Sequence, residues 1–341
     1  MPAASSPDKG VASNAREDPV SSMQAIRTVL EASGISGKTA DIVLAAWRPG
    51  TSKAYSSYIK RWTLFCAQRN KNPIRPSVTR LLKFLTELYE EGKGYSALNV
   101  ARSSISTLTV DSEKIGAHPL VCKFMRGVFN LRPSLPRNVV TWDADQVLIL
   151  LEKWGPAKFL SLRQLTLKVT LLLLLLSGQR GQTIWLIDIR NITVCKGQLR
   201  IRFGDLLKTS TPKCQQHEIV LSAYPPNRRL CIVTYMKAYL DRTAPLRQGE
   251  TKLLLSYRVP HSRVSRDTVR RWTKSVMKEA GIDLEIFTPH STRAASTSKV
   301  AGKIPLKTIL QTAGWRRRST FAMFYHKPVV KETGFSTAML S

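Results

Sequence analysis

Five side chains in the C-terminal half of the chain have the chemical types needed to attack a phosphodiester without a metal ion: Arg180, His290, Arg293, Trp315 and Tyr325. A phosphodiester resists nucleophiles because its oxygens are negatively charged, so a protein must supply fixed cationic donors aimed at them. The guanidinium groups of Arg180 and Arg293 suit this task, since each is planar, permanently charged and able to contact two phosphate oxygens at once. The set therefore indicates chemistry at a phosphate diester.

The remaining side chains supply a nucleophile and proton donors. Tyr325 can attack the phosphorus and form a covalent phosphotyrosine that stores the bond energy, so no ATP, metal or other cofactor is expected. His290 can assist proton movement or hold the phosphate, and the indole N–H of Trp315 can donate to a phosphate oxygen. A lysine on a flexible stem suits the role of general acid for the leaving sugar hydroxyl. Lys208 is the predicted residue, and Lys213 in the same expected hairpin is the alternative.

Local sequence signals predict helices that position these residues. Thr288-Pro289 is typical of an N-cap followed by proline in the first turn, so a helix is expected to start at His290 and to place His290 and Arg293 on one face. A second helix is expected over residues 305–312, with Gly314 as its stop signal.

A last helix is expected to begin with Ser319 as its cap and to turn Phe321, Phe324 and the nearby tyrosine towards a packed face. The apolar run 171–176 is too short to span a bilayer, which needs about 20 residues. It is predicted to be a buried helix that delivers Arg180 to the site.

The order of these residues resembles that of the tyrosine recombinases, the phage-integrase family, in which a histidine or tryptophan occupies the fifth place: Arg180, Lys208, His290-x-x-Arg293, Trp315, Tyr325. The segments 289–298, 312–315 and 321–325 look like those of recombinases from eukaryotic DIRS-type and Ngaro-type retrotransposons. The resemblance covers residues 40 to 330. Family members often carry an acidic residue three positions after the first arginine, where this chain has Thr183.

The resemblance implies a mainly α fold, with an N-terminal helical core-binding domain of SAM-like fold and a mixed α+β catalytic domain that contains a small antiparallel sheet. It also implies a site-specific recombinase or integrase that cleaves and rejoins double-stranded DNA through a 3′-phosphotyrosine. The expected assembly is a homotetramer on paired DNA sites, and the expected role is the integration of a mobile element. The nucleus is the expected location if the source is eukaryotic, and another intracellular location otherwise.

Each residue taken alone also has a simpler explanation. Tyr325 can be a core residue, Trp315 a hydrophobic plug after Gly314, Arg180 the snorkelling end of a helix, and Lys208 a solvated loop charge. Their combination in family order favours the catalytic interpretation. Two other functions remain open, a catalytically inactive DNA-binding protein derived from a recombinase and a type IB topoisomerase that relaxes a single duplex.

The composition agrees with a nucleic-acid partner. The chain has 53 Lys plus Arg against 23 Asp plus Glu, a formal net charge of +30, which attracts a polyanion and makes its binding steeply salt-dependent. A ribosomal or RNA-binding protein would show the same balance. The cysteines, which lack any C-x-x-C pair, suggest neither a zinc site nor a disulfide framework and favour a reducing intracellular compartment: Cys66, Cys122, Cys195, Cys214 and Cys231.

The chain is expected to divide into a disordered tail over residues 1–18, a helical DNA-binding domain over 19–135 and a catalytic domain over 136–341, with a proline-containing linker near 131–141. Apolar residues at helical spacing predict first-domain helices over 51–69, 77–90, 96–108 and 120–130. The second domain is expected to have helices over 143–153, 228–242 and 265–279 and strands over 187–193, 198–203 and 217–221.

Basic residues on the polar faces of these helices, and in the Arg-rich segment after Trp315, are predicted to contact DNA phosphates. They are Lys53, Lys60, Arg61, Arg80, Arg102, Arg266, Arg270, Arg271 and Arg316.

The assignment of the general acid can be tested with DNA in which sulfur replaces the bridging oxygen of the leaving group. If Lys208 donates the proton, Lys208→Ala should cleave ordinary DNA about 10² to 10⁴-fold more slowly. It should cleave the sulfur-bridged substrate almost as fast as the wild type, because a thiolate leaves without being protonated. Rescue of Lys213→Ala instead would move the role to Lys213, and rescue of neither variant would exclude both lysines.

Overall fold

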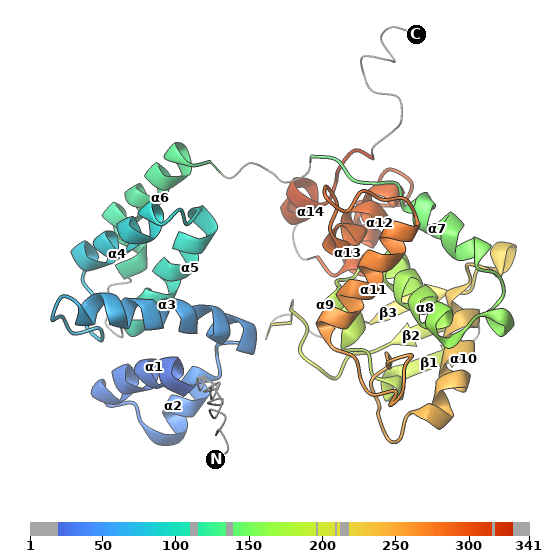
Figure 1. The fold of residues 1–341 in the computed structure, drawn as a ribbon, viewed down its shortest axis with the longest axis horizontal. Coiled ribbons are helices and arrows are strands. Elements are labelled where there is room, and N and C mark those ends of the chain that lie inside the picture. Colours follow the sequence, from blue (N-terminus) through green and yellow to red (C-terminus); the bar gives the residue numbers. More distant parts are fainter. Residues whose placement is uncertain are drawn as a thin grey trace, which may run out of the picture. The chain divides into compact units, whose positions relative to one another are not determined.

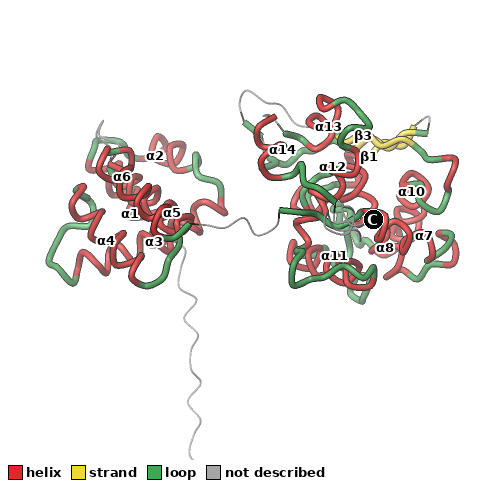
Figure 2. Tube along the Cα trace, turned by 90° about the horizontal axis from the view of Figure 1, so that it is seen from above, coloured by secondary structure: helices red, strands yellow, loops and turns green. Residues whose placement is uncertain are grey.

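The computed structural model describes residues 20–109, 115–133, 139–195, 197–208, 210–211, 218–315 and 318–329, apart from the side chains of 20–22. The predicted disordered tail, the alternative acid Lys213 and the predicted DNA contact Arg316 lie outside these residues. The chain divides into two compact units, Met1–Leu135 and Pro136–Ser341. Helices dominate both units, and the strands form one small patch in the second (Figures 1 and 2), which confirms the predicted mainly α fold with a small antiparallel sheet.

The first unit is helical throughout the part that is described. Its helices are α1 (Val20–Ala32), α2 (Gly37–Leu44), α3 (Pro49–Ala67), α4 (Val78–Glu90), α5 (Tyr95–Ile105) and α6 (Pro119–Leu131). Helices α3 to α6 match the expected helices to within a few residues, whereas α1 and α2 were not expected. The core is built around Trp62, Phe65 and Phe84, whose ring centroids lie 5.3–5.5 Å apart. The fully buried Trp62 donates its indole N–H to the Pro73 carbonyl at 2.9 Å, so its polar atom is also satisfied.

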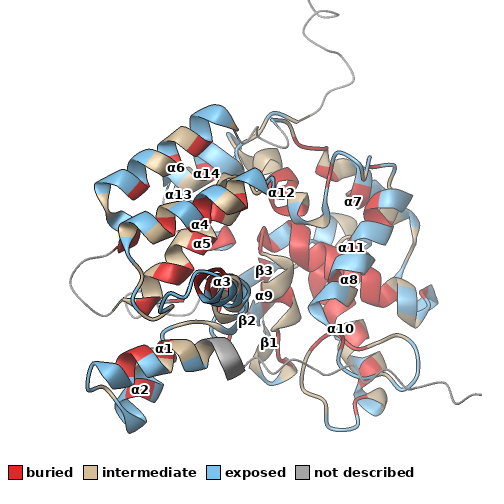
Figure 3. Ribbon diagram, turned by 60° about the vertical axis from the view of Figure 1, so that its left-hand side comes forward, coloured by how far each residue is buried: buried red, intermediate tan, exposed pale blue. Residues whose placement is uncertain are grey.

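The second unit surrounds a buried helix. Its elements are α7 (Ala144–Lys153), α8 (Leu162–Ser177), α9 (Gly181–Trp185), β1 (Ile192–Cys195), β2 (Gln198–Ile201), β3 (Ile219–Ser222), α10 (Ile232–Thr243), α11 (Arg266–Glu279), α12 (Thr292–Val300), α13 (Leu306–Ala313) and α14 (Arg318–Phe324). Helix α8 packs against α10, α11 and α12, and Figure 3 shows that most of it is buried. Leu171–Leu175 are buried, which confirms the predicted buried helix, while Leu176 at its end is 41% exposed.

Sequence signals at both ends of α8 explain its bounds. Ser161 and Gln164 form a capping box, in which each side chain accepts from the backbone N–H of the other residue. At the other end Gly178 adopts a left-handed conformation with φ of +58° and stops the helix. The chain can therefore turn sharply and enter α9 at Arg180.

The sheet is antiparallel with the order β1-β2-β3, and Ile192 pairs with Ile201, which in turn pairs with Ile219. The expected strand over residues 187–193 was wrong over most of its length. The buried carboxylate of Asp188 accepts bonds from the backbone and side chain of Arg190 and from the hydroxyl of Thr251, which holds Ile189–Asn191 in a 3₁₀ turn. β1 therefore begins only at Ile192.

No helix in the described part of the chain is long and apolar enough to cross a membrane.

Gly178→Ala is expected to destabilise the second unit by about 2–3 kcal/mol, because the left-handed conformation penalises an L residue and the added methyl group would meet Cγ2 of Thr297 at 3.1 Å. Gly249→Ala is the matched control. Its φ is +86°, but an added Cβ would find nothing within 4 Å, so only the backbone penalty of about 1–2 kcal/mol applies. Urea unfolding of the full chain gives both values. Equal losses would show that the contact with Thr297 has no energetic role.

Candidate active site

Arg180 is placed by the turn that follows α8. Gln179 in this turn is buried, and its Nε2 donates to the carbonyl of Thr312 at 2.8 Å, which ties the turn to α13. Arg180 is then the N-cap residue of α9 and is half-buried. Thr183, at the position where the resemblance leads one to expect an acidic residue, is buried inside α9. Arg180 therefore has no carboxylate from its own helix beside it.

The segment carrying His290 and Arg293 differs from the expected helix at its start. Pro289–Ser291 forms a 3₁₀ turn, and the α-helix α12 begins only at Thr292. The Thr288 side chain makes no capping bond. Instead the hydroxyl of Ser291 donates to the Thr288 carbonyl at 2.7 Å and accepts from the indole N–H of Trp142 at 2.7 Å. Trp142, which is far away in the sequence, therefore stabilises the turn through Ser291, and this contact takes the place of the expected cap.

Arg293 is almost fully buried, with 1% of its surface exposed. Its guanidinium carbon lies 4.0 Å from the ring centroid of Trp315 and 5.2 Å from that of Tyr325, and its Nη2 donates to the Ala313 carbonyl at 2.7 Å. Nε and Nη1 of Arg293 and Nε1 of Trp315 are buried with no hydrogen-bond partner among the described residues. Buried donors are rarely left unpaired. The unpaired donors are on two of the residues predicted to hold a phosphate.

Tyr325 lies just after α14, and its hydroxyl is 3.4 Å from Nε2 of His290. Its ring centroid is 4.7 Å from that of Trp315. The backbone of Tyr325 is also fixed, because Ser298 of α12 donates its hydroxyl to the Tyr325 carbonyl at 2.8 Å and accepts from the Lys327 N–H at 3.1 Å. Four of the six predicted site residues thus form one set of direct contacts: His290, Arg293, Trp315 and Tyr325. They come from the 3₁₀ turn before α12, from α12 itself and from the residues that follow α13 and α14.

The expected start of the last helix was wrong by two residues, since Ser319 is not its cap: α14 begins at Arg318 and contains Ser319. Phe321 is 4% exposed and packs against Trp315, with ring centroids 5.3 Å apart, as expected. Phe324 is 57% exposed and does not share that face. Trp315 also packs with Ile309 and Ala313, so its ring fills the core while its indole N–H is the predicted hydrogen-bond donor to a phosphate.

Positive charge converges on His290. Partial desolvation first, and then the charges of Arg180, Arg293 and Lys208, lower the pKa of the His290 imidazole. Lys208 is exposed in the loop after β2, yet it is close enough for its charge to act on His290. Burial and the charge of Arg180 likewise lower the pKa of Arg293, although a guanidinium stays protonated at neutral pH. Among the described residues, no ion pair involves Arg180, Lys208 or Arg293. The site is therefore suited to an anion.

The predicted DNA contacts of the first unit have varied surroundings. Lys53 and Lys60 are exposed on α3. Arg61 pairs with Glu91, and Arg80 donates to the Asn72 carbonyl at 2.9 Å and to the Ser77 hydroxyl at 3.3 Å. These two arginines therefore have structural partners, which compete with any contact to DNA. Of the remaining predicted contacts, Arg102 is half-buried on α5, and those of the second unit are exposed on α11: Arg266, Arg270 and Arg271.

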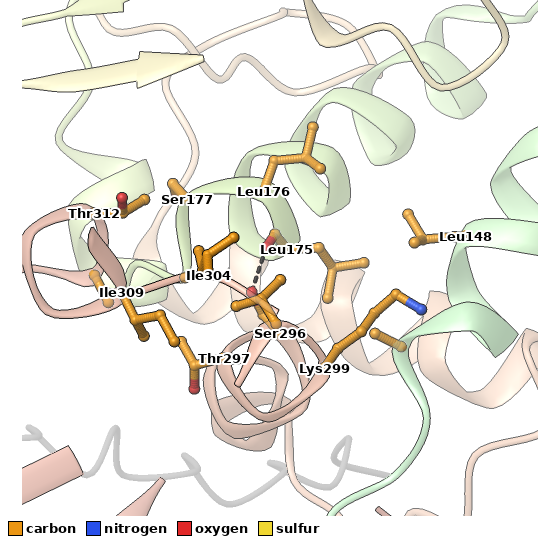
Figure 4. Close-up of a pocket in the computed structure, with 14 residues that line it drawn as sticks. Leu148, Leu175, Leu176, Ser177, Ser296, Thr297, Lys299, Ile304, Ile309 and Thr312 are labelled. Atoms are coloured by element: carbon orange, nitrogen blue, oxygen red, sulfur yellow. Dashed lines mark hydrogen bonds between the residues drawn. The ribbon is translucent and has the colours of Figure 1, made fainter. Parts of the chain in front are cut away.

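This unit also has an apolar hollow that is separate from the predicted site residues. It lies between α7, α8, α12 and α13, has a volume of about 200 Å³ and is lined mostly by apolar side chains such as Leu148, Leu175 and Ile309 (Figure 4). None of the six predicted site residues lines it. Two of its lining residues are hydrogen-bonded: the hydroxyl of Ser296 donates to the Leu175 carbonyl and so joins α12 to α8 (Figure 4). In the described part of the chain, no three His, Cys, Asp or Glu residues are grouped so that they could hold a metal ion.

Sequence reasoning missed the residues whose hydrogen bonds fix the segments that carry the site, namely Gln179, Ser291, Ser298 and Trp142. Gln179 and Ser291 lie next to predicted site residues, and that proximity was the only available signal. Ser298 and Trp142 act across 27 and 149 positions of the chain. Their roles depend on packing that no local pattern encodes.

Comparisons with known proteins give the family whose model matches this chain and the solved structures that share its fold. The model of the phage integrase family matches residues 143–330. XerH site-specific recombinase bound to a palindromic difH substrate is 12% identical with a TM-score of 0.60, covering 92% of this chain and 94% of that one. The Tn1549 transposon integrase in complex with transposon right end DNA is 13% identical with a TM-score of 0.54, covering 94% and 97%. A lambda integrase dimer bound to a COC′ core site is 15% identical with a TM-score of 0.53, covering 92% and 79%. No curated protein sequence matches the chain.

The charges around His290 predict how its pKa responds to substitution. Arg180→Gln should raise the pKa of His290, because protonation no longer adds a positive charge beside that guanidinium. Lys208→Gln should raise it by less, since Lys208 is the weakest of the three charged influences. An NMR titration of the imidazole, assigned with His290→Gln, measures both shifts, and Lys278→Gln on the far end of α11 is the charge-matched control. An unchanged or lower pKa in Arg180→Gln would contradict the proximity of these groups.

Proposed function

Because the chain belongs to the phage integrase family of tyrosine recombinases, we propose that it cleaves and rejoins double-stranded DNA through a 3′-phosphotyrosine formed on Tyr325. The observation that carries this proposal is the contact set around the tyrosine. Its hydroxyl is 3.4 Å from His290, its ring covers Arg293, and unpaired donors of Arg293 and Trp315 lie beneath it. A tyrosine hydroxyl beside donors that are suited to a phosphate supports the role of Tyr325 as nucleophile.

In the proposed cleavage step, the Tyr325 oxygen attacks the phosphorus and the bond from phosphorus to the 5′ oxygen breaks. The lowered pKa of His290 keeps its ring neutral, so Nε2 can accept the tyrosine proton when Nδ1 carries the ring proton. Lys208 donates a proton to the leaving 5′ oxygen. Attack by a 5′ hydroxyl on the phosphotyrosine reverses the step and joins the strands, so no external energy source is needed.

Arg180, Arg293 and Trp315 would stabilise the negative charge that develops on the phosphate oxygens. In the structure, the rings of Trp315 and Tyr325 cover the guanidinium of Arg293, at 4.0 and 5.2 Å. The tyrosine ring must therefore shift before a phosphate oxygen can reach Nε and Nη1. In this arrangement the two rings shield the buried arginine until DNA binds.

The proposed substrate is double-stranded DNA, which is present in the solved complexes of XerH, the Tn1549 integrase and lambda integrase. A net charge of +30 supports the same partner. We further propose a homotetramer on paired sites, the integration of a mobile element related to DIRS-type or Ngaro-type retrotransposons, and a nuclear location in a eukaryotic source. These proposals rest on the resemblance of the motifs and on the titles of the similar structures, one of which is a tetramer on a Holliday junction.

Tyr325→Phe should abolish the covalent protein–DNA adduct while leaving DNA affinity nearly unchanged, because only the attacking oxygen is lost. The test uses nicked suicide substrates tiled across the DNA that flanks the coding sequence, in excess EDTA. The wild type and Tyr224→Phe, which removes a hydroxyl from an exposed tyrosine of the same unit, should both form the adduct.

An adduct with Tyr325→Phe would overturn the choice of nucleophile, and strict dependence on magnesium would overturn the metal-free mechanism. A wild-type protein that binds these substrates but forms no adduct would be an inactive derivative. Relaxation of a single supercoiled plasmid without pairing of two sites would instead indicate a topoisomerase.

A further inference from the structure

A cavity of about 390 Å³ adjoins the catalytic histidine on the side of α9 and α11. His290 forms part of its wall together with Pro289 and Thr288, and Gly181 and Gln182, which directly follow Arg180, form another part. The opposite wall comes from α11, with Arg266 and Arg270 as its cationic side chains. The cavity therefore shares His290 with the proposed active site, while the mechanism gives no role to the α11 side chains that line it.

The wall formed by α11 is rigid. Ser265 caps the helix by accepting from the Thr268 N–H at 3.1 Å, and Val269 and Thr273, which also line the cavity, are 1% and 2% exposed. Arg266 and Arg270 are one turn apart on this helix, so their guanidinium groups can converge on one ligand. Among the described residues, neither takes part in an ion pair.

The charges that face the cavity favour an anion. Arg266, Arg270 and the positive end of the α11 dipole attract an anion, and the carboxylate of Asp267 repels it. Gln182 adds an uncharged hydrogen-bond donor. Arg271, the next residue along the chain, lines a different cavity with Arg258 and Arg263. The arginines of α11 are thus divided between two sites rather than spread over one basic surface.

We propose that this cavity holds the backbone phosphate adjacent to the scissile one on the cleaved DNA strand, with Arg270 and Arg266 as positioning residues. The inference rests on the proposed function, because it assigns a neighbour to the phosphate that Tyr325 attacks. The side chains favour a phosphate over a base, since two arginines line the cavity and a guanidinium group can contact two phosphate oxygens. Holding this second phosphate fixes the register of the strand, so that the scissile phosphorus lies in line with the tyrosine oxygen.

The test combines variants of the protein with DNA in which single phosphates are neutral. Suicide substrates carry one methylphosphonate in place of either phosphate that flanks the cleavage site, and single-turnover cleavage is measured at saturating protein. In the wild type, neutralising one of these positions should slow cleavage by about 10- to 100-fold. This is the range expected when the loss of one contact lets the scissile phosphate shift out of its reactive position. Arg270→Ala should cause a similar loss on native DNA.

The decisive result is the coupling between the two changes. Arg270→Ala should lose little more on the substrate that is already neutral at that position, because the same contact has been removed twice. Arg270→Lys should recover part of the rate on native DNA, since it restores the charge. The logarithm of the binding constant of Arg270→Ala should also depend less steeply on salt, by about one phosphate contact. Lys278→Ala, which removes one charge from the other end of the same helix, should show no coupling with either position.

The proposal is overturned if the loss of cleavage rate in Arg270→Ala multiplies with the loss caused by the neutral linkage at both positions. Arg266→Ala provides a second variant for the same comparison. Asp267→Asn should tighten binding of native DNA, and a loss of affinity would contradict an anion in this cavity. If the wild type forms no adduct on any substrate, the proposed function fails. An adduct without coupling leaves that function intact and removes only this phosphate site.

Discussion

The burial of Arg293, which has no ion-pair partner among the described residues, is the constraint on which the rest of the catalytic unit depends. A permanently charged group in the interior is costly unless the surrounding atoms replace its hydration. Here the Ala313 carbonyl accepts from one nitrogen, and the rings of Trp315 and Tyr325 lie against the guanidinium at 4.0 and 5.2 Å. Two of its nitrogens remain unpaired. The arrangement is stable only if these rings and the carbonyl are held firmly by other elements.

Helix α8 provides that support. Its buried leucines anchor the unit, and its end is fixed to α12 through the bond from Ser296 to the Leu175 carbonyl and to α13 through the bond from Gln179 to the Thr312 carbonyl. Gly178 lets the chain turn where an added Cβ would meet Thr297 at 3.1 Å. The hydrophobic core therefore sets the spacing of Arg180, α12 and α13, and this spacing brings positive groups together despite their mutual repulsion.

The same repulsion gives the site its chemical character. Desolvation of His290 lowers its pKa, the cationic neighbours lower it further, and both effects favour the neutral ring. A neutral imidazole beside the tyrosine hydroxyl can accept a proton, whereas the surrounding guanidinium groups are chemically suited to a phosphate. Binding of DNA would relieve the repulsion, so part of the binding energy is supplied by charges that the fold keeps close together in the free protein.

The sequence by itself determined most of the helices and the set of residues proposed for the site. The leucine run of α8 and the glycine after α13 are local signals: the first indicated a buried helix before Arg180, and the second gave the end of α13 to within a residue or two. The order of the predicted catalytic residues identified the family. Only the tertiary structure decided that Phe324 points outward, that Trp142 holds the turn before α12, and that Asp188 delays the start of β1. It also decided that the first-unit arginine Arg61 has a structural partner in Glu91. The physical reason is that propensity and capping act within a few residues along the chain, while burial, charge pairing and hydrogen bonds between distant residues depend on which elements pack together in space.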